Sequence, residues 1–162
     1  MASTVSAGTL KVKIIEEIKL NGKDQGGVTS FNIASINEIS KRILTITTAE
    51  STIATFSTAV ASAGHYVAGD VRYIRFTNLM DSSDNFITLT FRNQDNDEVA
   101  IKLDAGQSFI WNGDNANGMT AVFNATQDAD AASDTAFGSL TNIQADANSG
   151  SCDLEMLVAS AS

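Results

Sequence analysis

Few side chains in this chain could carry catalysis. The 162 residues include one histidine, His65, and one cysteine, Cys152. His65 lies in a predicted loop with no cysteine partner nearby, and residue spacing alone does not indicate a Ser-His-Asp arrangement. Cys152 falls within a strand pattern, where a lone cysteine behaves as a small buried hydrophobic residue and excludes an intramolecular disulfide. We therefore predict that the chain is not an enzyme and has no catalytic or cofactor-binding residues.

Carboxylates are the other groups that could do chemistry. Asp and Asn are favoured in turns because their side chains bond the local backbone, so clustered acids in turns are predicted to be solvated turn residues. The alternative is calcium, since the segment 128–134 places Asp oxygens at its positions 1, 3 and 7. That segment lacks the central glycine and terminal glutamate of an EF-hand, and no other metal or cofactor is indicated. The clusters are Asp81 with Asp84, Asp95 with Asp97 and Glu98, and Asp128 with Asp130 and Asp134.

Aromatic side chains suggest a second kind of site. Tyr66, Tyr73 and Trp111 are the candidates for exposed rings on which a sugar could stack, with Asn and Asp residues nearby. Trp111 stands at a predicted strand end, so a place in the core or at its rim is the alternative. The phenylalanines alternate with polar residues and are predicted to be core. They are Phe31, Phe56, Phe76, Phe86, Phe91 and Phe109.

The elements that position these residues are predicted to be strands. Short β-branched runs separated by turn residues follow one another, with no 3.6-residue apolar stripe in the first 110 positions. Such a pattern predicts an all-β fold, an antiparallel β-sandwich or jelly-roll-like domain of about nine to ten strands. Segment 61–70 is expected to be a connecting loop, and segment 119–124 a strand or a helical turn. The runs are 10–20, 28–39, 41–48, 52–60, 71–79, 85–93, 99–103, 108–111, 139–145 and 152–158.

Three features of this pattern give specific expectations. The block from Val71 to Trp111 predicts four consecutive antiparallel strands, and the last two runs predict a closing hairpin. In the first run, alternation breaks at 15–17, which suggests a bulge that resets the register. The segment Asn21-Gly22-Lys23-Asp24 predicts a turn, with Gly26 and Gly27 as a flexible corner.

Length and composition limit the number of domains and the possible partners of the chain. The length fits one domain, predicted over 10–159, between a flexible N-terminal arm (1–9) and a C-terminal tail (160–162). No apolar run is long enough for a transmembrane helix, and the N-terminus does not resemble a secretory signal, so we expect synthesis in a cytoplasm and no membrane partner. A net charge of −9 argues against nucleic-acid binding.

Charge and proline content point to assembly. Residues 1–80 carry eight basic and six acidic residues, whereas residues 81–162 carry two basic and thirteen acidic residues. This asymmetry favours self-association or docking on a charged partner, unless folding interleaves the two halves. The chain has no proline, which commonly guards exposed sheet edges. Edges covered by partners or by closure would explain its absence, and drift in composition is the alternative.

The chain also resembles a known group of proteins. Segments 71–79, 85–89 and 101–110 resemble small virion structural proteins of marine tailed bacteriophages, and the segment Lys19 to Asp24 and the richness in Ser, Thr, Ala and Asn are similar to the same group. The resemblance covers most of the chain and carries no active-site motif. It implies a component of the particle exterior, and no functional residue is transferred from it.

These observations lead to one main hypothesis and one alternative. The resemblance implies a capsid decoration (cement) protein that binds and stabilises the outer shell, with the phage major capsid protein or another virion protein and copies of itself as partners. Its location would be the virion, after synthesis in the host cytoplasm. The alternative is a tail- or fibre-associated protein or a glycan-binding adhesion module that uses Trp111 and the loop acids.

Overall fold

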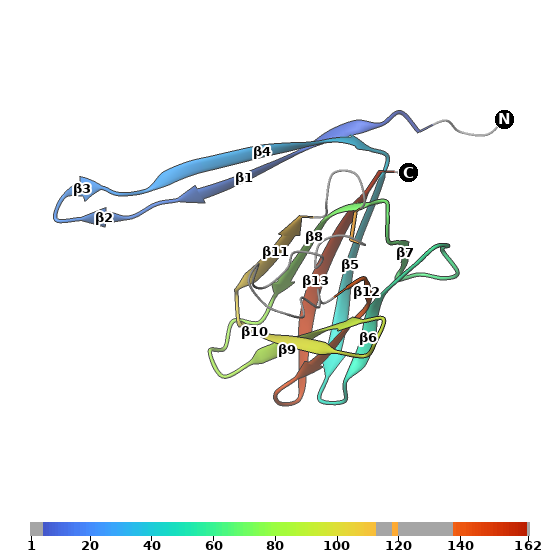
Figure 1. The fold of residues 1–162 in the computed structure, drawn as a ribbon. Coiled ribbons are helices and arrows are strands. Elements are labelled where there is room, and N and C mark those ends of the chain that lie inside the picture. Colours follow the sequence, from blue (N-terminus) through green and yellow to red (C-terminus); the bar gives the residue numbers. More distant parts are fainter. Residues whose placement is uncertain (1–4, 113–117, 120–137, 162) are drawn as a thin grey trace, which may run out of the picture.

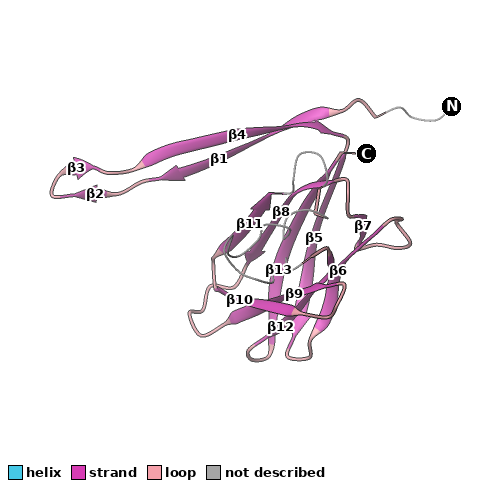
Figure 2. Cartoon of the chain, viewed as in Figure 1, coloured by secondary structure: helices cyan, strands magenta, loops and turns pink. Residues whose placement is uncertain are grey.

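The fold is a β-sandwich with a long hairpin that projects from it (Figure 1). The computed structural model describes residues 5–112, 118–119 and 138–161, and within these ranges it contains thirteen strands and no helix (Figure 2). The predicted all-β class is therefore confirmed. The strand number exceeds the predicted nine to ten because the structure adds three short strands of two or three residues, β2, β3 and β7.

Two sheets form the body. The first has the order β11-β8-β13-β5 and the second has the order β10-β9-β12-β6-β7. The strands of the four-stranded sheet are β11 (Ser108–Asn112), β8 (Val71–Asn78), β13 (Ser151–Ser160) and β5 (Glu38–Thr47). Those of the five-stranded sheet are β10 (Glu98–Asp104), β9 (Phe86–Asn93), β12 (Leu140–Ala147), β6 (Ser51–Ser57) and β7 (His65–Val67).

The core lies between these two sheets. Alternate residues of β9 point inward, and Ile87, Leu89 and Phe91 are buried, as their spacing predicts. From the opposite sheet, β13 contributes a row of four buried side chains. Burying each large apolar side chain stabilises the fold by about 1.5–3 kcal/mol. The four side chains are Cys152, Leu154, Met156 and Val158.

The predicted neighbours in sequence are not all neighbours in a sheet. The predicted closing hairpin is wrong, because β12 pairs with β6 and β9 whereas β13 pairs with β5 and β8. Likewise β8 and β9 belong to different sheets, so the four-strand block pairs as β8 with β11 and β9 with β10. In each of these two cases, β12 with β13 and β8 with β9, both of the connected strands carry a row of apolar side chains that points inward. Two such rows are best buried when they face each other across the sandwich.

Two smaller predictions also need correction. Segment 61–70 is not all loop, since β7 within it pairs in parallel with β6. Phe86 is not in the core: it is half-buried, and the Lys102 ammonium lies over its ring at 4.6 Å from the centroid. Phe86 belongs to the residues of β9 that alternate with the inward row, so strand period places it on the other face.

The projecting hairpin, called the arm below, spans residues 8–36. Its strands are β1 (Gly8–Glu16), β2 (Lys19–Leu20), β3 (Lys23–Asp24) and β4 (Gly27–Ile36). The predicted turn closes it, with Asn21 at φ 51° and Gly22 at φ 78°, the left-handed values that a two-residue type I′ turn requires.

The register of the arm shows that the bulge predicted at 15–17 is wrong. Pairing runs without a shift from Leu10↔Ile33 to Glu16↔Gly27 and resumes in the same register at Lys19↔Asp24. The one irregularity lies at the opposite end, between Gly8 and Leu10. The register of the two strands is therefore constant along the arm and shifts only where the arm joins the body.

Candidate functional site

The two residues with the most reactive side chains lie apart from each other. His65 is half-buried in β7, where its backbone N–H donates to the Ser62 carbonyl oxygen at 3.0 Å. Cys152 is fully buried in the core, as predicted. Burial raises the pKa of the Cys152 thiol, and the neighbouring Asp153 charge raises it further. The thiol is thus held protonated and away from solvent, the opposite of an activated nucleophile.

The carboxylate clusters that are described behave as turn residues. Asp81 and Asp84 are exposed in the loop before β9. In the next turn the Asn93 side-chain oxygen accepts hydrogen bonds from the backbone N–H groups of Asp95 and Asp97, at 2.9 and 2.7 Å, and Glu98 pairs with Arg92.

The calcium candidates cannot be placed in the same way. Asp128, Asp130 and Asp134 lie outside the described residues. Elsewhere in the described ranges, no three His, Cys, Asp or Glu side chains are grouped so that they could hold a metal.

The aromatic side chains do not form an exposed platform. Tyr66 and Tyr73 are only 6% and 4% exposed, so the expectation that they lie on the surface is wrong. The Tyr66 hydroxyl lies 3.2 Å from the Ser40 hydroxyl, and burial raises the pKa of Tyr73, although the Arg75 charge lowers it. Trp111 is half-buried and meets the Phe91 ring edge-on, with centroids 5.2 Å apart, which fits the predicted role at the core's rim.

The arm has one apolar face that the strand period defines. Leu10, Val12 and Ile14 of β1 share this face, and because the register continues through β2, so do Ile18 and Leu20. Across the ladder, Ile33 and Phe31 stand opposite Leu10 and Val12 on the same face. We call this set the apolar face of the arm.

The base of the apolar face is buried against the body. Val12, Ile33 and Ile36 pack with Tyr73 and Ala159 on the outer face of the four-stranded sheet. Partly buried side chains around them complete a small second core, separate from the one inside the sandwich. They are Leu10, Phe31, Ile110, Leu157 and Ala161.

The tip of the arm leaves the same face uncovered. Ile14, Ile18 and Leu20 are 38%, 50% and 56% exposed. On the opposite face Ile15 and Val28, which pair across the ladder, are also exposed. A two-stranded ribbon without a third layer is only marginally stable in water. The tip therefore has the composition of a surface that another molecule covers.

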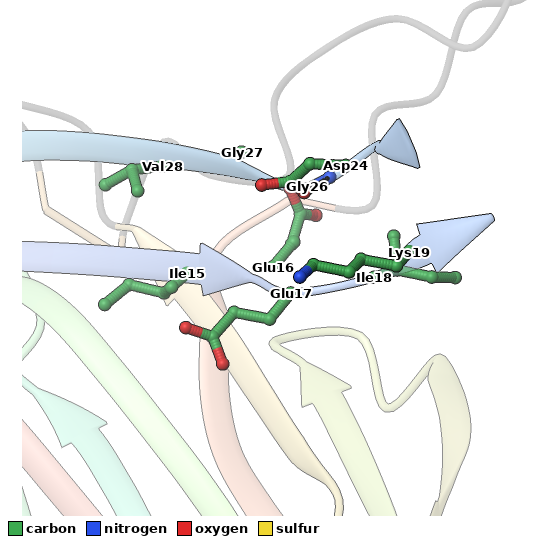
Figure 3. A pocket seen from close by; sticks show the side chains of 9 residues that line it. All are labelled: Ile15, Glu16, Glu17, Ile18, Lys19, Asp24, Gly26, Gly27 and Val28. Atoms are coloured by element: carbon green, nitrogen blue, oxygen red, sulfur yellow. Dashed lines mark hydrogen bonds between the residues drawn. The ribbon is translucent and has the colours of Figure 1, made fainter. Parts of the chain in front are cut away.

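An open hollow of about 510 Å³ lies on this tip (Figure 3). Its lining combines charged side chains, apolar side chains and two glycines. The lining residues are Ile15, Glu16, Glu17, Ile18, Lys19, Asp24, Gly26, Gly27 and Val28.

Beside the arm's base, the outer face of the four-stranded sheet carries an ion network. The Glu155 carboxylate, 13% exposed, pairs with the Lys41 ammonium at 2.8 Å and with the Arg75 guanidinium at 2.5 Å. These hydrogen bonds, first from Lys41 and then from Arg75, lower the pKa of Glu155. Thr77 accepts a further hydrogen bond from Arg75 at 2.5 Å. The network fixes β5, β13 and β8 side by side.

A second hollow, of about 350 Å³, opens at the edge where β4 turns into β5. Leu10, Ile36 and Ile39 supply its apolar lining, and the rest of the lining consists of Ser6, Gly8, Thr9 and Asn37. The corner itself is tied to the C-terminal strand, because the Asn37 N–H donates to the Ser160 carbonyl oxygen at 3.1 Å. Ile39, at 52% exposed, marks the solvent side of this hollow.

Sequence reasoning did not identify the arm as the candidate site. Alternation from Leu10 to Leu20 and the Asn21-Gly22 turn predict a hairpin, but its separation from the body depends on long-range packing. One signal was present: the apolar residues between 14 and 28 fall on both faces of a two-stranded hairpin, which cannot bury both faces by itself. No helix able to cross a membrane is found in the described ranges.

Comparison of the chain with protein-family models, with curated proteins and with solved structures found no significant match. The fold and the site therefore stand on the geometry described above.

Proposed function

We propose that this chain is a non-catalytic assembly protein of a bacteriophage particle, a decoration (cement) protein that binds the outer shell and stabilises it. The observation that carries the proposal is the arm: a hairpin projecting from a rigid sandwich, with Ile14, Ile18 and Leu20 exposed along one face. Side chains of this kind gain about 1.5–3 kcal/mol each when a partner, either the shell or a neighbouring copy of the chain on it, buries them.

The division between body and arm suits such a role. The sandwich has a continuous core and contributes rigidity, while the arm extends the reach of one subunit beyond its own body. A subunit that bridges neighbours in this way would resist their separation without any moving part. The small second core at Val12, Ile33 and Tyr73 anchors the arm so that force on the tip is passed to the sandwich.

The tail- or fibre-associated alternative uses the same features and differs only in the partner. A glycan-binding role has less support, because Tyr66 and Tyr73 are buried and Trp111 packs on Phe91. The experiment below includes tail assemblies, so it distinguishes the tail-associated alternative from shell binding.

The test is co-sedimentation of the full chain with shells assembled from the major capsid protein encoded in the same phage genome. Tail assemblies from that genome, and shells of an unrelated phage, serve as comparisons. We expect saturable binding to the cognate shells and a higher temperature of shell disruption when the protein is bound. Binding to tails alone would support the tail-associated alternative, and binding to neither would refute an assembly role.

A further inference from the structure

The tip of the arm is exposed, and none of the residues that the structure describes in the body covers it. The last side chains of the apolar face that the body buries are Val12 and Phe31. From Ile14 to Leu20 the strand runs on for about 20 Å, at roughly 3.3 Å per residue. The free part of the arm is thus longer than the four-stranded sheet is wide, because three spacings between strands amount to about 14 Å.

The direction of the arm places its tip on the far side of the molecule from the second hollow. The arm begins next to β5, crosses the outer face by way of Leu157, Tyr73 and Ile110, and extends beyond the side that carries β11 (Figure 1). The hollow at Leu10, Ile36 and Ile39 lies at the opposite edge, beside β5. One subunit thus presents an apolar knob at one side and an apolar hollow at the other.

The charged residues immediately beside the two apolar surfaces are complementary, although the tip as a whole, residues 14–29, carries two lysines and three acids. At the tip, Lys19 and Lys23 flank Leu20, and at the hollow Glu38 precedes Ile39. None of Lys19, Lys23 and Glu38 forms an ion pair within the described residues.

We infer that the tip of the arm docks on a second copy of this chain, with Ile18 and Leu20 in the hollow formed by Leu10, Ile36 and Ile39. The contact joins two different surfaces, so each subunit donates one arm and receives one. Such head-to-tail contacts close into a ring when the rotation between subunits allows it, and otherwise continue as a filament. This inference rests on the proposed function, for which it names the partner of the arm; contact with the shell is left to other surfaces.

Sedimentation of the full chain over a range of concentrations tests the inference. The wild type is expected to self-associate, and L20D and I39D are each expected to raise the dissociation constant by about tenfold or more, since each places a charge at an apolar contact. V60D is the matched control, because Val60 is 60% exposed and lies on neither surface, and it should associate like the wild type.

A mixture of the two variants gives the sharper result. The L20D subunit keeps an intact hollow and the I39D subunit keeps an intact arm, so an equimolar mixture should form one sound contact per pair. We expect 1:1 dimers and no larger species, whereas either variant alone stays monomeric. A symmetrical arm-to-arm contact would instead be broken by L20D and unaffected by I39D, and that outcome would overturn the inference.

A cysteine pair provides a measurement that does not depend on weakening the contact. The L20C/I39C double variant should form disulfide-linked oligomers under mild oxidation, because the two positions within one chain lie roughly 40 Å apart along the arm. The native Cys152 is buried and does not compete. Absence of cross-linking in the double variant would also overturn the inference.

The outcomes separate this inference from the proposed function. A wild type that stays monomeric, yet loses shell binding in L20D, would show that the shell covers the arm: the inference fails and the proposed function stands. If the chain self-associates through the arm but does not bind the shell, the inference stands and the proposed function fails.

Discussion

Gly26 lies so close to the opposite strand of the arm that a Cβ atom in its place would stand 2.0 Å from the Glu16 carbonyl oxygen. The G26A variant must therefore push the two strands apart at this point. Gly27, next to it, has only an ordinary contact with the Glu16 side chain at 3.7 Å. We expect G26A to loosen the tip of the arm and G27A to leave it intact.

Amide hydrogen exchange can measure this difference. The Gln25 N–H donates to the Ile18 carbonyl oxygen at 2.9 Å, so its protection reports the pairing of the tip. In G26A the exchange of Gln25 should become about tenfold faster, while amides of β8 and β13 in the body keep their protection. Equal protection of Gln25 in G26A and in the wild type would contradict the close approach.

Glu155 should make stability depend on pH on the acid side. Its pKa is lowered in the folded state, first by the hydrogen bond from Lys41 and then by that from Arg75. The folded state then binds fewer protons than the unfolded state, so this contribution is complete above the ordinary Glu pKa of about 4.3 and is lost as pH falls through the lower folded value.

The variant E155Q tests this relationship. We expect it to cost on the order of 1 kcal/mol at pH 7 and to remove part of the fall in stability below pH 4.3 or so. Urea unfolding at a series of pH values gives both quantities. E98Q is the control, because the Arg92–Glu98 pair is more exposed, with 41% of the Glu98 side chain accessible, and should matter less. A pH profile of E155Q parallel to that of the wild type would refute the role of the network.

Asn78 joins the two sheets through its side chain and is completely buried. At the end of β8, its Nδ2 donates to the Leu103 carbonyl oxygen in β10 at 3.0 Å, and its Oδ1 accepts from the Met80 N–H at 3.1 Å. N78A would leave the buried Leu103 carbonyl and the partly buried Met80 N–H without these partners. We expect a loss of about 2 kcal/mol in the free energy of unfolding, measured by urea denaturation.

The control for Asn78 is N32A, on the exposed face of the arm, where we expect a change within about 0.5 kcal/mol. If the two variants had the same stability, Asn78 would not act as a latch between the sheets.

Local pattern predicted the strands of the body because their burial alternates with period two. Phe91 and Met156 fall on inward rows that can be read from neighbouring residues alone. Which strands pair could not be predicted in the same way. β12 and β13 each carry a row of apolar side chains that another layer of the protein must bury. The sequence does not distinguish a hairpin, in which the two strands pair in one sheet, from a connection that crosses between the two sheets.

The candidate site was less accessible to prediction for a related reason. Strand period predicts that Tyr73 and Ala159 face away from the core, which for most sheets means solvent. They are buried only because the base of the arm, some 40 to 150 residues away in sequence, packs on them. A buried polar residue that links the sheets, such as Asn78, is not predicted for the same reason, since an Asn at the end of a strand is ordinarily a turn residue.

The arm can be shortened at a defined place, which separates its two parts. Ile14 and Thr29 pair directly and, like Ile18 and Gln25, stand at a hydrogen-bonded position of the ladder. Residues 15–28 can therefore be replaced by Asn-Gly, and a two-residue type I′ turn would close a shorter hairpin in the same register. The base with Val12, Phe31 and Ile33 is retained. We expect a melting temperature within about 2 °C of the wild type, because nothing removed contacts a core of the body.

The shortened chain should behave differently only in association. Circular dichroism gives its melting temperature, and sedimentation gives its mass under the conditions in which the wild type self-associates. A folded monomer would show that the tip contributes contacts between molecules and none to the fold. A large fall in melting temperature would contradict the division into base and tip, because the tip would then be stabilising the sandwich from which it projects.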